Sequence, residues 1–262
     1  DCEGTNATNK KKIKECEETI DILINKKLET NHHSDYFDTP SYWNCKNITE
    51  KNFTEDHLVY SSLYVKKNIQ YMLQKSVKSS NKYSDIMKNV IVKKVERLEN
   101  MELWYRYCME KSNIARRNPD GCKPLDDHPL TYKLTSIFNK TDTKVNEFYL
   151  WHGLRDPDDA TIIKKQGLDE RVASLKGLYG GGCYFAENSD KSSQYMSSDS
   201  HGQYCILLCR VLIGDWSHTK TTRRDERRPP EKLDGRLYDS VIADNGASDH
   251  KEFVVYNGAQ VY

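Results

Sequence analysis

Residues 149–195 constrain the fold more than any other part of this chain. An apolar run opens the stretch and predicts a buried strand that ends at His152-Gly153. Asp156-Pro157 then predicts the start of a helix, with proline at the first helical position and Gly167 just past the helix end. The first half of the stretch is therefore expected to deliver an imidazole and a bare backbone to the tip of a strand.

The second half adds a glycine-rich loop and another strand. Residues 179–182 read Tyr-Gly-Gly-Gly, and the apolar run over residues 183–186 predicts a buried strand. Asn188 is expected to cap a helix that carries Ser192 and Tyr195 on one face. Two strands and two helices thus bring polar and aromatic side chains to one cleft, which predicts a binding site.

The remaining pattern indicates the α+β class. Helical spacing marks residues 10–29, a second segment from Val65 onward, and a third helix that begins after Asn100. Strand patterns lie over residues 58–63, 90–98, 203–214, 238–243 and 252–257. Most strands lie in the second half and most helices in the first, so βαβ alternation is not expected.

Several motifs in the same order resemble the catalytic domain of the poly(ADP-ribose) polymerases, the diphtheria-toxin-like ADP-ribosyltransferases. The motifs are His152-Gly153, the string over residues 179–186, the pair of Ser192 and Tyr195, and Glu252 at the start of Glu-Phe-Val-Val-Tyr. The centre is most similar to the tankyrase branch. Weaker similarity upstream extends the resemblance to residues 37–262.

This resemblance implies an ADP-ribosyltransferase fold of two antiparallel sheets, packed as a split barrel and flanked by helices. We expect a catalytic domain over residues 37–262, preceded by a helical or linker segment over residues 1–36. Residues 37–150 leave no room for an all-helical regulatory domain, so gating by DNA breaks is not expected.

The implied reaction transfers ADP-ribose from NAD, the donor substrate, to protein acceptors that include the chain itself. Positive charge develops on the ribose, so the site needs a slot for nicotinamide, a grip on the dinucleotide and an anion. The resemblance assigns the walls of the slot to Tyr184 and Tyr195. It assigns contacts with the carboxamide to the Gly153 backbone and the Ser192 hydroxyl.

The resemblance assigns the grip to His152 and the covering of the adenine end to Asp169 and its loop. A single histidine after an apolar run is more often a core residue. Here the accompanying motifs favour a ligand-binding role for His152. Glu252 is the implied anion, and with His152 and Tyr184 it completes the triad of chain-elongating members. Lys191 matches a position associated with the same members, so polymer synthesis is permitted.

Some residues depart from the family pattern and keep a second hypothesis open. Leu154 replaces the hydroxyl residue that usually follows His-Gly, and Val172 stands where tankyrases have histidine. The tankyrase Cys/His cluster is missing, so no structural zinc is expected. The alternative function is a catalytically silent module that binds ADP-ribose, nucleic acid or a partner protein.

Composition limits the partners. The formal net charge is +1, so neither nucleic acid nor an anionic membrane is an expected partner of this domain. No apolar run is long enough to span a membrane. The eight cysteines form no Cys-x-x-Cys pair. We expect an intracellular protein, cytoplasmic or nuclear, whereas the sequons at Asn6, Asn47, Asn52 and Asn139 leave a disulfide-bonded secreted glycoprotein as a third interpretation.

Overall fold

A computed structural model describes residues 39–44, 56–78, 82–134, 141–244 and 250–262. Within the chain, Thr39–Tyr262 forms one compact unit. The helix predicted over residues 10–29 lies outside the described residues, and so do the asparagines of all four sequons. The structural statements below concern the described residues alone.

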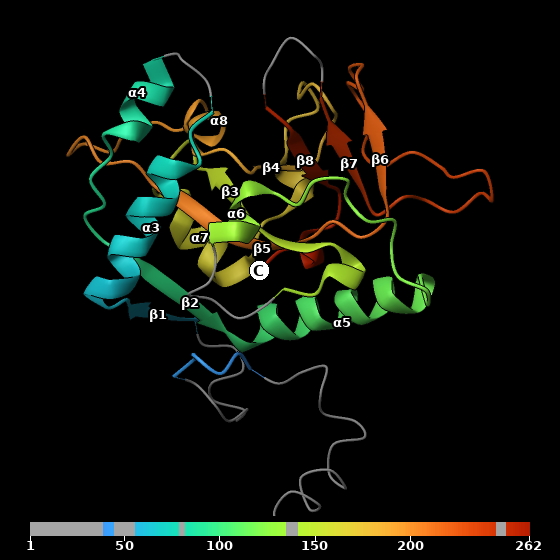
Figure 1. Cartoon of the computed structure of the whole chain (residues 1–262), viewed down its shortest axis with the longest axis horizontal. Helices are drawn as coiled ribbons and strands as arrows, with labels where there is room; N and C mark the ends of the chain where they lie inside the picture. Colours follow the sequence, from blue (N-terminus) through green and yellow to red (C-terminus); the bar gives the residue numbers. More distant parts are fainter. Residues whose placement is uncertain (1–38, 45–55, 79–81, 135–140, 245–249) are drawn as a thin grey trace, which may run out of the picture. The chain divides into compact units, whose positions relative to one another are not determined.

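The helices occupy both halves of the described chain (Figure 1). The α-helices are α3 (Leu63–Lys75), α4 (Lys82–Lys88), α5 (Met101–Arg117), α6 (Leu130–Leu134), α7 (Asp159–Gln166) and α8 (Ser189–Ser193). Three short 3₁₀ turns are η1 (Thr143–Val145), η2 (Glu170–Val172) and η3 (Gly258–Gln260).

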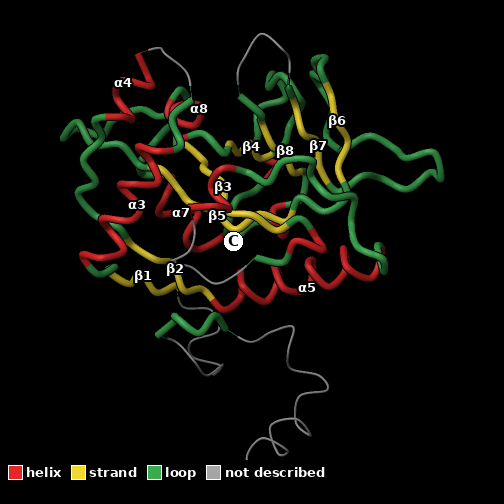
Figure 2. Tube along the Cα trace, in the orientation of Figure 1, coloured by secondary structure: helices red, strands yellow, loops and turns green. Residues whose placement is uncertain are grey.

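The strands form two sheets. The smaller sheet pairs β1 (Asp56–Tyr60) with β2 (Glu96–Asn100) in antiparallel fashion. The larger sheet has the order β5-β3-β4-β8-β7-β6. Its strands are β3 (Glu147–Gly153), β4 (Cys183–Ala186), β5 (Ile206–Leu212), β6 (Trp216–Thr219), β7 (Ser240–Ala243) and β8 (Glu252–Val255). This mixture of helices and a six-stranded sheet confirms the α+β class (Figure 2).

One pairing in the larger sheet differs from the expected antiparallel pattern. β6 and β7 run parallel, with Trp216 opposite Ser240 and Thr219 opposite Ala243. Parallel neighbours need a long connection, and residues 220–239 supply it without a helix.

The sheet is nearly divided between β3 and β4. A single pair of residues, Trp151 and Ala186, joins these strands, whereas β3 and β5 are paired along seven residues. The two halves of the sheet therefore diverge beyond this pair, which leaves backbone groups of β4 available to other partners. This opening lies where the sequence motifs meet.

Side chains on the two faces of the sheet enter different clusters. Phe148, Phe185 and Phe253 belong to the main core on one face. On the other face, Trp151 packs against Met72 and other apolar residues of α3 and α4. Because β8 is buried on both faces, its run after Glu252 is continuously apolar and does not alternate.

Helix α5 begins as expected at Asn100, whose side-chain oxygen accepts a hydrogen bond from the Leu103 N–H at 3.0 Å. Its first turns place Trp104 and Tyr107 in an aromatic cluster with Trp43 and Tyr262. Trp43, Trp104 and Tyr107 are buried, as the sequence predicted for Trp104 and Tyr107, whereas Tyr262 is partly exposed.

The strand predicted over residues 90–98 was placed too early. Residues 90–95 are irregular and β2 begins at Glu96, because the backbone of the earlier residues bonds to α3. Gln74 donates to the Val90 carbonyl at 3.2 Å, and the Val92 N–H donates to Gln70 at 3.0 Å. The side chains of Gln70 and Gln74 thus bond to backbone groups that a neighbouring strand would otherwise pair with.

Two predicted helix boundaries also shift. The helix expected at Pro157 begins at Asp159, because Asp156 Oδ1 first accepts the Asp158 N–H in a turn. Gly167 ends it as predicted, with φ of 78°. Helix α8 stops at Ser193, so Tyr195 lies beyond it, and Asn188 forms no side-chain cap bond.

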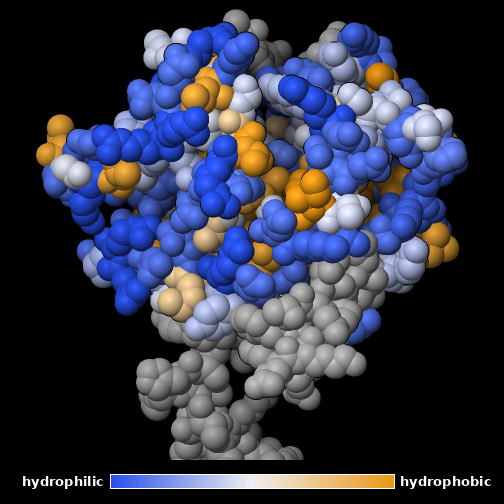
Figure 3. Space-filling view, turned by 180° about the vertical axis from the view of Figure 1, so that it is seen from behind, coloured by the Kyte–Doolittle hydropathy of each residue, from blue (hydrophilic) through white to orange (hydrophobic). Residues whose placement is uncertain are grey.

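The surface seen from behind shows small orange groups of hydrophobic residues between blue hydrophilic ones (Figure 3). Scattered exposure of this kind is ordinary for a folded domain. Among the described residues, no helix combines the length and apolar character needed to cross a membrane.

Candidate active site

The site begins with the register of β4 and β8. Glu252, the first residue of β8, lies opposite Ala186 of β4, and Val254 lies opposite Tyr184. Because side chains alternate along a strand, Glu252 and Tyr184 project from the same face of the sheet. Segments that are 68 residues apart in sequence thus bring a carboxylate and a phenol to one surface.

Helix α8 brings a cation to this carboxylate. Lys191 Nζ lies 3.1 Å from Glu252 Oε1, and the two side chains are 10% and 5% exposed. The Tyr195 hydroxyl lies 3.4 Å from Glu252 Oε2, and Lys191 Nζ lies 5.4 Å from the centre of the Tyr195 ring. The Glu252 carboxylate therefore contacts two other predicted site residues, Lys191 and Tyr195.

The electrostatics of this group follow from burial and from the Glu252 charge. Burial alone would lower the pKa of Lys191, but the nearby Glu252 carboxylate outweighs it and raises the pKa. Burial raises the pKa of Tyr195, and Glu252 raises it further. Lys191 is therefore a charged ammonium group, and the neighbouring Tyr195 phenol is neutral.

His152 lies at the opening between β3 and β4. Its Nδ1 lies 2.7 Å from the Tyr184 carbonyl oxygen, and a carbonyl only accepts, so Nδ1 carries the proton. Burial lowers the pKa of the imidazole, and the bond to Tyr184 opposes this in part. A neutral ring with its proton on Nδ1 leaves Nε2 as an acceptor for a ligand hydroxyl.

Strand alternation qualifies the predicted convergence of the three triad residues. His152 alternates with Trp151 and packs against Phe185, with ring centres 5.3 Å apart. Its side chain therefore belongs to the other face from Tyr184 and Glu252, and the backbone of Tyr184 connects the two groups. The imidazole and the carboxylate therefore lie on different faces of the sheet.

Gly153 has a structural reason to be glycine. A Cβ built there would lie 2.2 Å from the Ser192 carbonyl oxygen and 2.9 Å from Met196 Cγ. The backbone of α8 occupies that space, so a larger residue would force the helix away from β3. The group that a side chain here would obstruct is thus the protein itself, and contact of the Gly153 backbone with a ligand stays a prediction.

The Ser192 hydroxyl already has a partner. It donates to the Trp151 carbonyl oxygen at 3.0 Å, and Ser192 is buried. This bond holds α8 against β3 beside Gly153. To donate to a ligand, as the sequence predicted, the hydroxyl must rotate away from Trp151.

The glycine-rich loop is fastened to Tyr184. The Tyr184 hydroxyl donates to the Gly180 carbonyl at 2.8 Å and accepts the Tyr179 N–H at 2.9 Å. Gly177 is close as well, since a Cβ there would lie 2.5 Å from the hydroxyl oxygen. The Tyr184 hydroxyl therefore holds the glycine-rich loop, and the role of its ring as a wall of the slot stays a prediction.

Asp169 is used within its own loop. Its carboxylate accepts hydrogen bonds from Arg171, at 2.7 Å from Nη2 and at 2.9 Å from the backbone N–H. The Arg171 side chain and backbone lower the pKa of Asp169 to about 2. Contact with the adenine end remains a prediction, and the observed role of Asp169 is to shape the turn that begins η2.

The two departures from the family pattern occupy different environments. Leu154 is buried at 3% exposed, directly after Gly153, whereas Val172 is 83% exposed at the end of η2. Their effects on ligand binding remain predictions.

Buried polar residues behind the site belong to none of the sequence motifs. Asp190 and His250 lie beside Lys191 and near Glu252 in sequence, and both are buried. The only available signals were an aspartate in the first turn of the predicted helix and a histidine two residues before Glu252.

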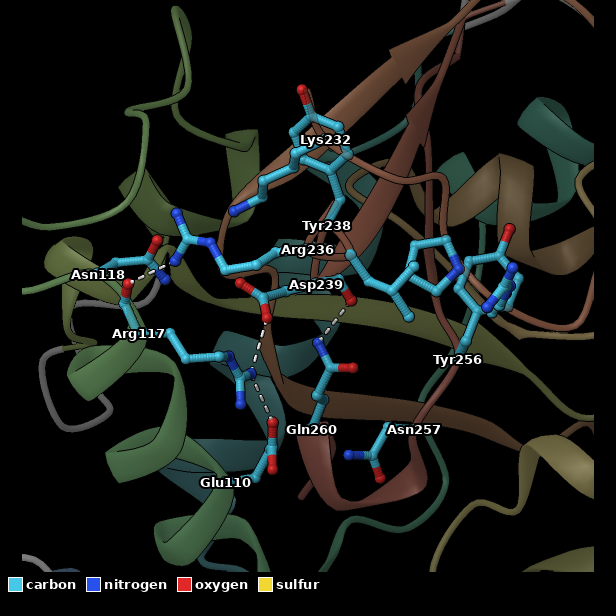
Figure 4. A pocket seen from close by; sticks show the side chains of 13 residues that line it. Glu110, Arg117, Asn118, Lys232, Arg236, Tyr238, Asp239, Tyr256, Asn257 and Gln260 are labelled. Carbon is cyan, nitrogen blue, oxygen red and sulfur yellow. Dashed lines mark hydrogen bonds and ion pairs between the residues drawn. The ribbon is translucent and has the colours of Figure 1, made fainter. Parts of the chain in front are cut away.

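A hollow of about 520 Å³ lies elsewhere, at the end of α5 (Figure 4). Arg117 points between Glu110 and Asp239, and Lys232 pairs with Asp215 at 2.6 Å. Arg228 and Arg236 are paired likewise with Glu231 and Asp234. Because these charges compensate one another, the hollow offers no net attraction for an anion, and Tyr256 is the one motif residue among those that line it.

Within the described ranges, no three His, Cys, Asp or Glu side chains are grouped so as to hold a metal ion. The expected absence of structural zinc stays a prediction that metal analysis of the purified protein can check.

Comparison with known proteins adds to this geometry. The family model of the poly(ADP-ribose) polymerase catalytic domain matches residues 66–262. The mouse protein mono-ADP-ribosyltransferase PARP12 is 29% identical over 226 residues, which cover 85% of this chain and 26% of the relative. The human PARP11, also named as a mono-ADP-ribosyltransferase, is 25% identical over 206 residues, covering 70% of this chain and 52% of that protein.

A tankyrase of Caenorhabditis elegans is 30% identical over 71 residues, which cover 26% of this chain and 3% of the relative. This chain thus spans about a quarter of the length of the PARP12 proteins it matches.

Proposed function

The chain belongs to the poly(ADP-ribose) polymerase catalytic-domain family, and from that premise we propose that it transfers ADP-ribose from NAD to protein side chains, with release of nicotinamide. The observation that carries the proposal is the buried Lys191–Glu252 pair, which shares a face of the sheet with Tyr184 and contacts Tyr195. The position of this pair supports a role for the Glu252 carboxylate as an anion beside an aromatic slot.

The residues fit the nicotinamide end of NAD. Tyr184 and Tyr195 supply aromatic walls, and a stacked ring contributes about 0.5–1.5 kcal/mol beyond area burial. The backbone of Gly153 is bare, and the Ser192 hydroxyl lies next to it on the Trp151 carbonyl. We assign these two groups to the carboxamide, with rotation of the Ser192 hydroxyl upon binding.

His152 fits a hydroxyl of the dinucleotide. Its Nδ1 is fixed by the Tyr184 carbonyl, so Nε2 accepts, and burial keeps the ring neutral. We assign Nε2 to a ribose hydroxyl on the adenosine side. The protein thereby orients the donor with a ring whose tautomer is set before binding.

Glu252 supplies the electrostatic contribution to transfer. As the bond to nicotinamide breaks, positive charge develops on the ribose, and a fixed carboxylate stabilises it. Lys191 holds the Glu252 oxygen Oε1 and leaves Oε2 toward Tyr195. We infer that Oε2 accepts the ribose hydroxyl or orients the incoming nucleophile.

Two observations point to different products. PARP12 and PARP11 are named as mono-ADP-ribosyltransferases and match most of this chain. By contrast, the combination of Lys191 and Glu252 resembles the pattern of elongating members. We therefore propose the transfer without assigning the length of the product. Electrophoresis of the modified protein distinguishes a ladder from a single sharp band.

We further propose an intracellular setting, with protein acceptors that include the chain itself. Cys108, Cys122, Cys183, Cys205 and Cys209 all have free thiols, as a reducing compartment would maintain them. Thiol titration of the folded and unfolded protein tests this, because a disulfide-bonded secreted form would lose thiols.

Incubation with labelled NAD tests the transfer. The wild-type chain is expected to label itself, and Glu252→Gln is expected to lose most of that label. Glu102→Gln changes an exposed carboxylate on α5 and serves as a matched control that keeps the label. A wild-type chain that labels neither itself nor added proteins would favour the silent binding module.

A further inference from the structure

Helix α8 has five residues, yet all of them are buried. Buried polar partners hold it in place. The Ser189 hydroxyl donates to the Leu73 carbonyl at 2.6 Å, and Asn188 Nδ2 donates to the Ser76 carbonyl at 3.0 Å. A helix this short has little stability of its own, so its position depends on these contacts.

Asp190 is the charged member of this network. Its side chain is 0% exposed, and its Oδ2 accepts the Ser84 hydroxyl of α4 at 2.9 Å. Its Oδ1 accepts the Lys78 backbone N–H at 3.3 Å. A buried carboxylate is costly without a cation, and His250 Nε2 lies 3.5 Å from Oδ2.

The hydrogen bonds around His250 determine its protons. Because the Ser76 carbonyl can only accept, the Asn188 atom that faces it is the amide nitrogen, so Asn188 Oδ1 faces the histidine. His250 Nδ1 lies 3.2 Å from that oxygen and must therefore donate. A neutral ring would then turn the lone pair of Nε2 toward the Asp190 carboxylate, which is repulsive.

We propose that His250 is a buried imidazolium paired with Asp190, and that this pair positions Lys191 and Glu252 for ADP-ribosyl transfer. Asp190 directly precedes Lys191 on α8, and His250 lies two residues before Glu252 at the start of β8. Two ion pairs, Asp190–His250 and Lys191–Glu252, thus join α8 to the start of β8. The first pair fixes the position of the second. The positioning role rests on the proposed function.

The surroundings of the ring are consistent with a cation. From α8 the ring meets the Asp190 carboxylate and the Asn188 oxygen, and α4 contributes the uncharged Ser84 hydroxyl to the same carboxylate. The ammonium of Lys191 is directed to Glu252 Oε1. Asp190 and His250 are therefore positioning residues, since their described contacts lie behind the slot and not in it.

Nitrogen-15 NMR of histidine side chains tests the ion pair without any assay of activity. At about pH 8, where an ordinary histidine is neutral, His250 is expected to show protons on both ring nitrogens. The exposed His201 serves as the internal reference. A single ring proton on His250 under these conditions would overturn the proposal.

Kinetics of NAD-dependent labelling test the positioning role. Asp190→Asn and His250→Gln are each expected to lower kcat about tenfold or more while KM for NAD stays within about twofold, because misplacement of Glu252 affects the reacting centre and not the aromatic slot. The double variant should be no slower than either single variant, since both changes break the same pair. His201→Gln should keep the wild-type constants.

Unchanged kcat, a change in KM alone, or losses that multiply in the double variant would each overturn the positioning role. A wild-type chain without activity would instead refute the proposed function, and the two failures are therefore distinguishable. If a variant does not fold, as thermal unfolding would show, the NMR measurement on the wild-type protein decides whether the ion pair exists.

Discussion

Glu147 and Glu252 are both buried carboxylates that begin a strand and meet a buried cation, but their surroundings differ. Glu147 is 0% exposed and accepts from Tyr107 at 2.6 Å, from Lys111 at 3.0 Å, from the Asp142 N–H at 2.7 Å and from Arg210 at 2.7 Å. Among described partners, Glu252 is bonded by Lys191 at 3.1 Å and weakly by Tyr195 at 3.4 Å.

The comparison indicates how to separate a structural carboxylate from one that acts on a ligand. An ionised carboxylate has about four lone-pair sites, and the partners of Glu147 fill them. Among the described residues, Glu252 Oε2 has a single long hydrogen bond, from Tyr195, on the face of the sheet that carries Tyr184. Burial and an ion pair are common to both carboxylates, so the smaller number of described partners is what distinguishes Glu252 from Glu147.

The largest expected effect is on the structural side of this comparison. Glu147→Gln leaves Arg210 buried beside a neutral group, and removing one partner of a buried pair costs about 3–5 kcal/mol of unfolding free energy. Urea denaturation measures the loss. A loss below about 1 kcal/mol, the range of an exposed pair, would contradict the structural role.

The pH dependence of Glu147 sharpens the same point. Burial alone would raise the pKa of this carboxyl, but Arg210 and Lys111 outweigh burial and lower it. Its contribution to stability is therefore complete above the ordinary glutamate pKa and is lost as the pH falls toward the lowered value. The Glu147→Gln variant should lack this part of the acid-induced loss.

Glu252→Gln also leaves a buried cation, Lys191, beside a neutral group, so it too is expected to lower the unfolding free energy. The difference is expected in activity, because transition-state stabilisation by one fixed group is worth about 10²–10³ in rate and kcat should fall by that factor. Measurement of kcat for folded Glu252→Gln and Glu147→Gln tests the contrast. If kcat falls by the same factor in both variants, the distinction between the two carboxylates is wrong.

A smaller effect is expected at Ser192. Removal of its hydroxyl in Ser192→Ala should cost about 1 kcal/mol of stability through the bond to Trp151, and a similar lost contact with NAD should raise KM about fivefold. Ser193→Ala is the matched control, because its hydroxyl donates to the Asp190 carbonyl on the same helix. Equal KM values for the two variants would exclude a ligand contact at Ser192.

The smallest expected effect concerns His152. Burial lowers the pKa of this imidazole, so the unfolded chain takes up a proton before the folded chain does. Stability that is complete above about pH 6.5 should therefore decline as the pH falls below it. His152→Gln keeps a donor for the Tyr184 carbonyl but cannot titrate, and its unfolding free energy should vary less between pH 7.5 and pH 5. Parallel curves would contradict a buried neutral ring.

Strong local patterns allowed much of the fold to be predicted. The strand over residues 183–186 and the cap at Asn100 are confirmed, because apolar runs and capping side chains act locally. The irregular residues 90–95 could not be predicted, since side chains of α3 replace their strand partner. The early end of α8 follows from packing of a helix too short to form by itself.

The site was predictable through its motifs but not through its geometry. Local sequence placed Glu252, Lys191 and Tyr195 in a candidate site, whereas strand register decides that His152 projects from the other face. Asp190 and His250 carry no motif, and they are connected by a contact across 60 residues. Such a pair becomes visible only when the fold brings the two segments together.

The two hydrogen bonds of the Tyr184 hydroxyl have a consequence for small molecules directed at the proposed nicotinamide slot. A flat aromatic compound that slides beside the ring leaves the Tyr179 and Gly180 attachments intact. A bulky compound that tilts the ring must also detach the overlying loop, and the lost attachments weaken its binding. Flat compounds should therefore bind more tightly than bulky ones, by more than the dimensions of the proposed slot alone would predict.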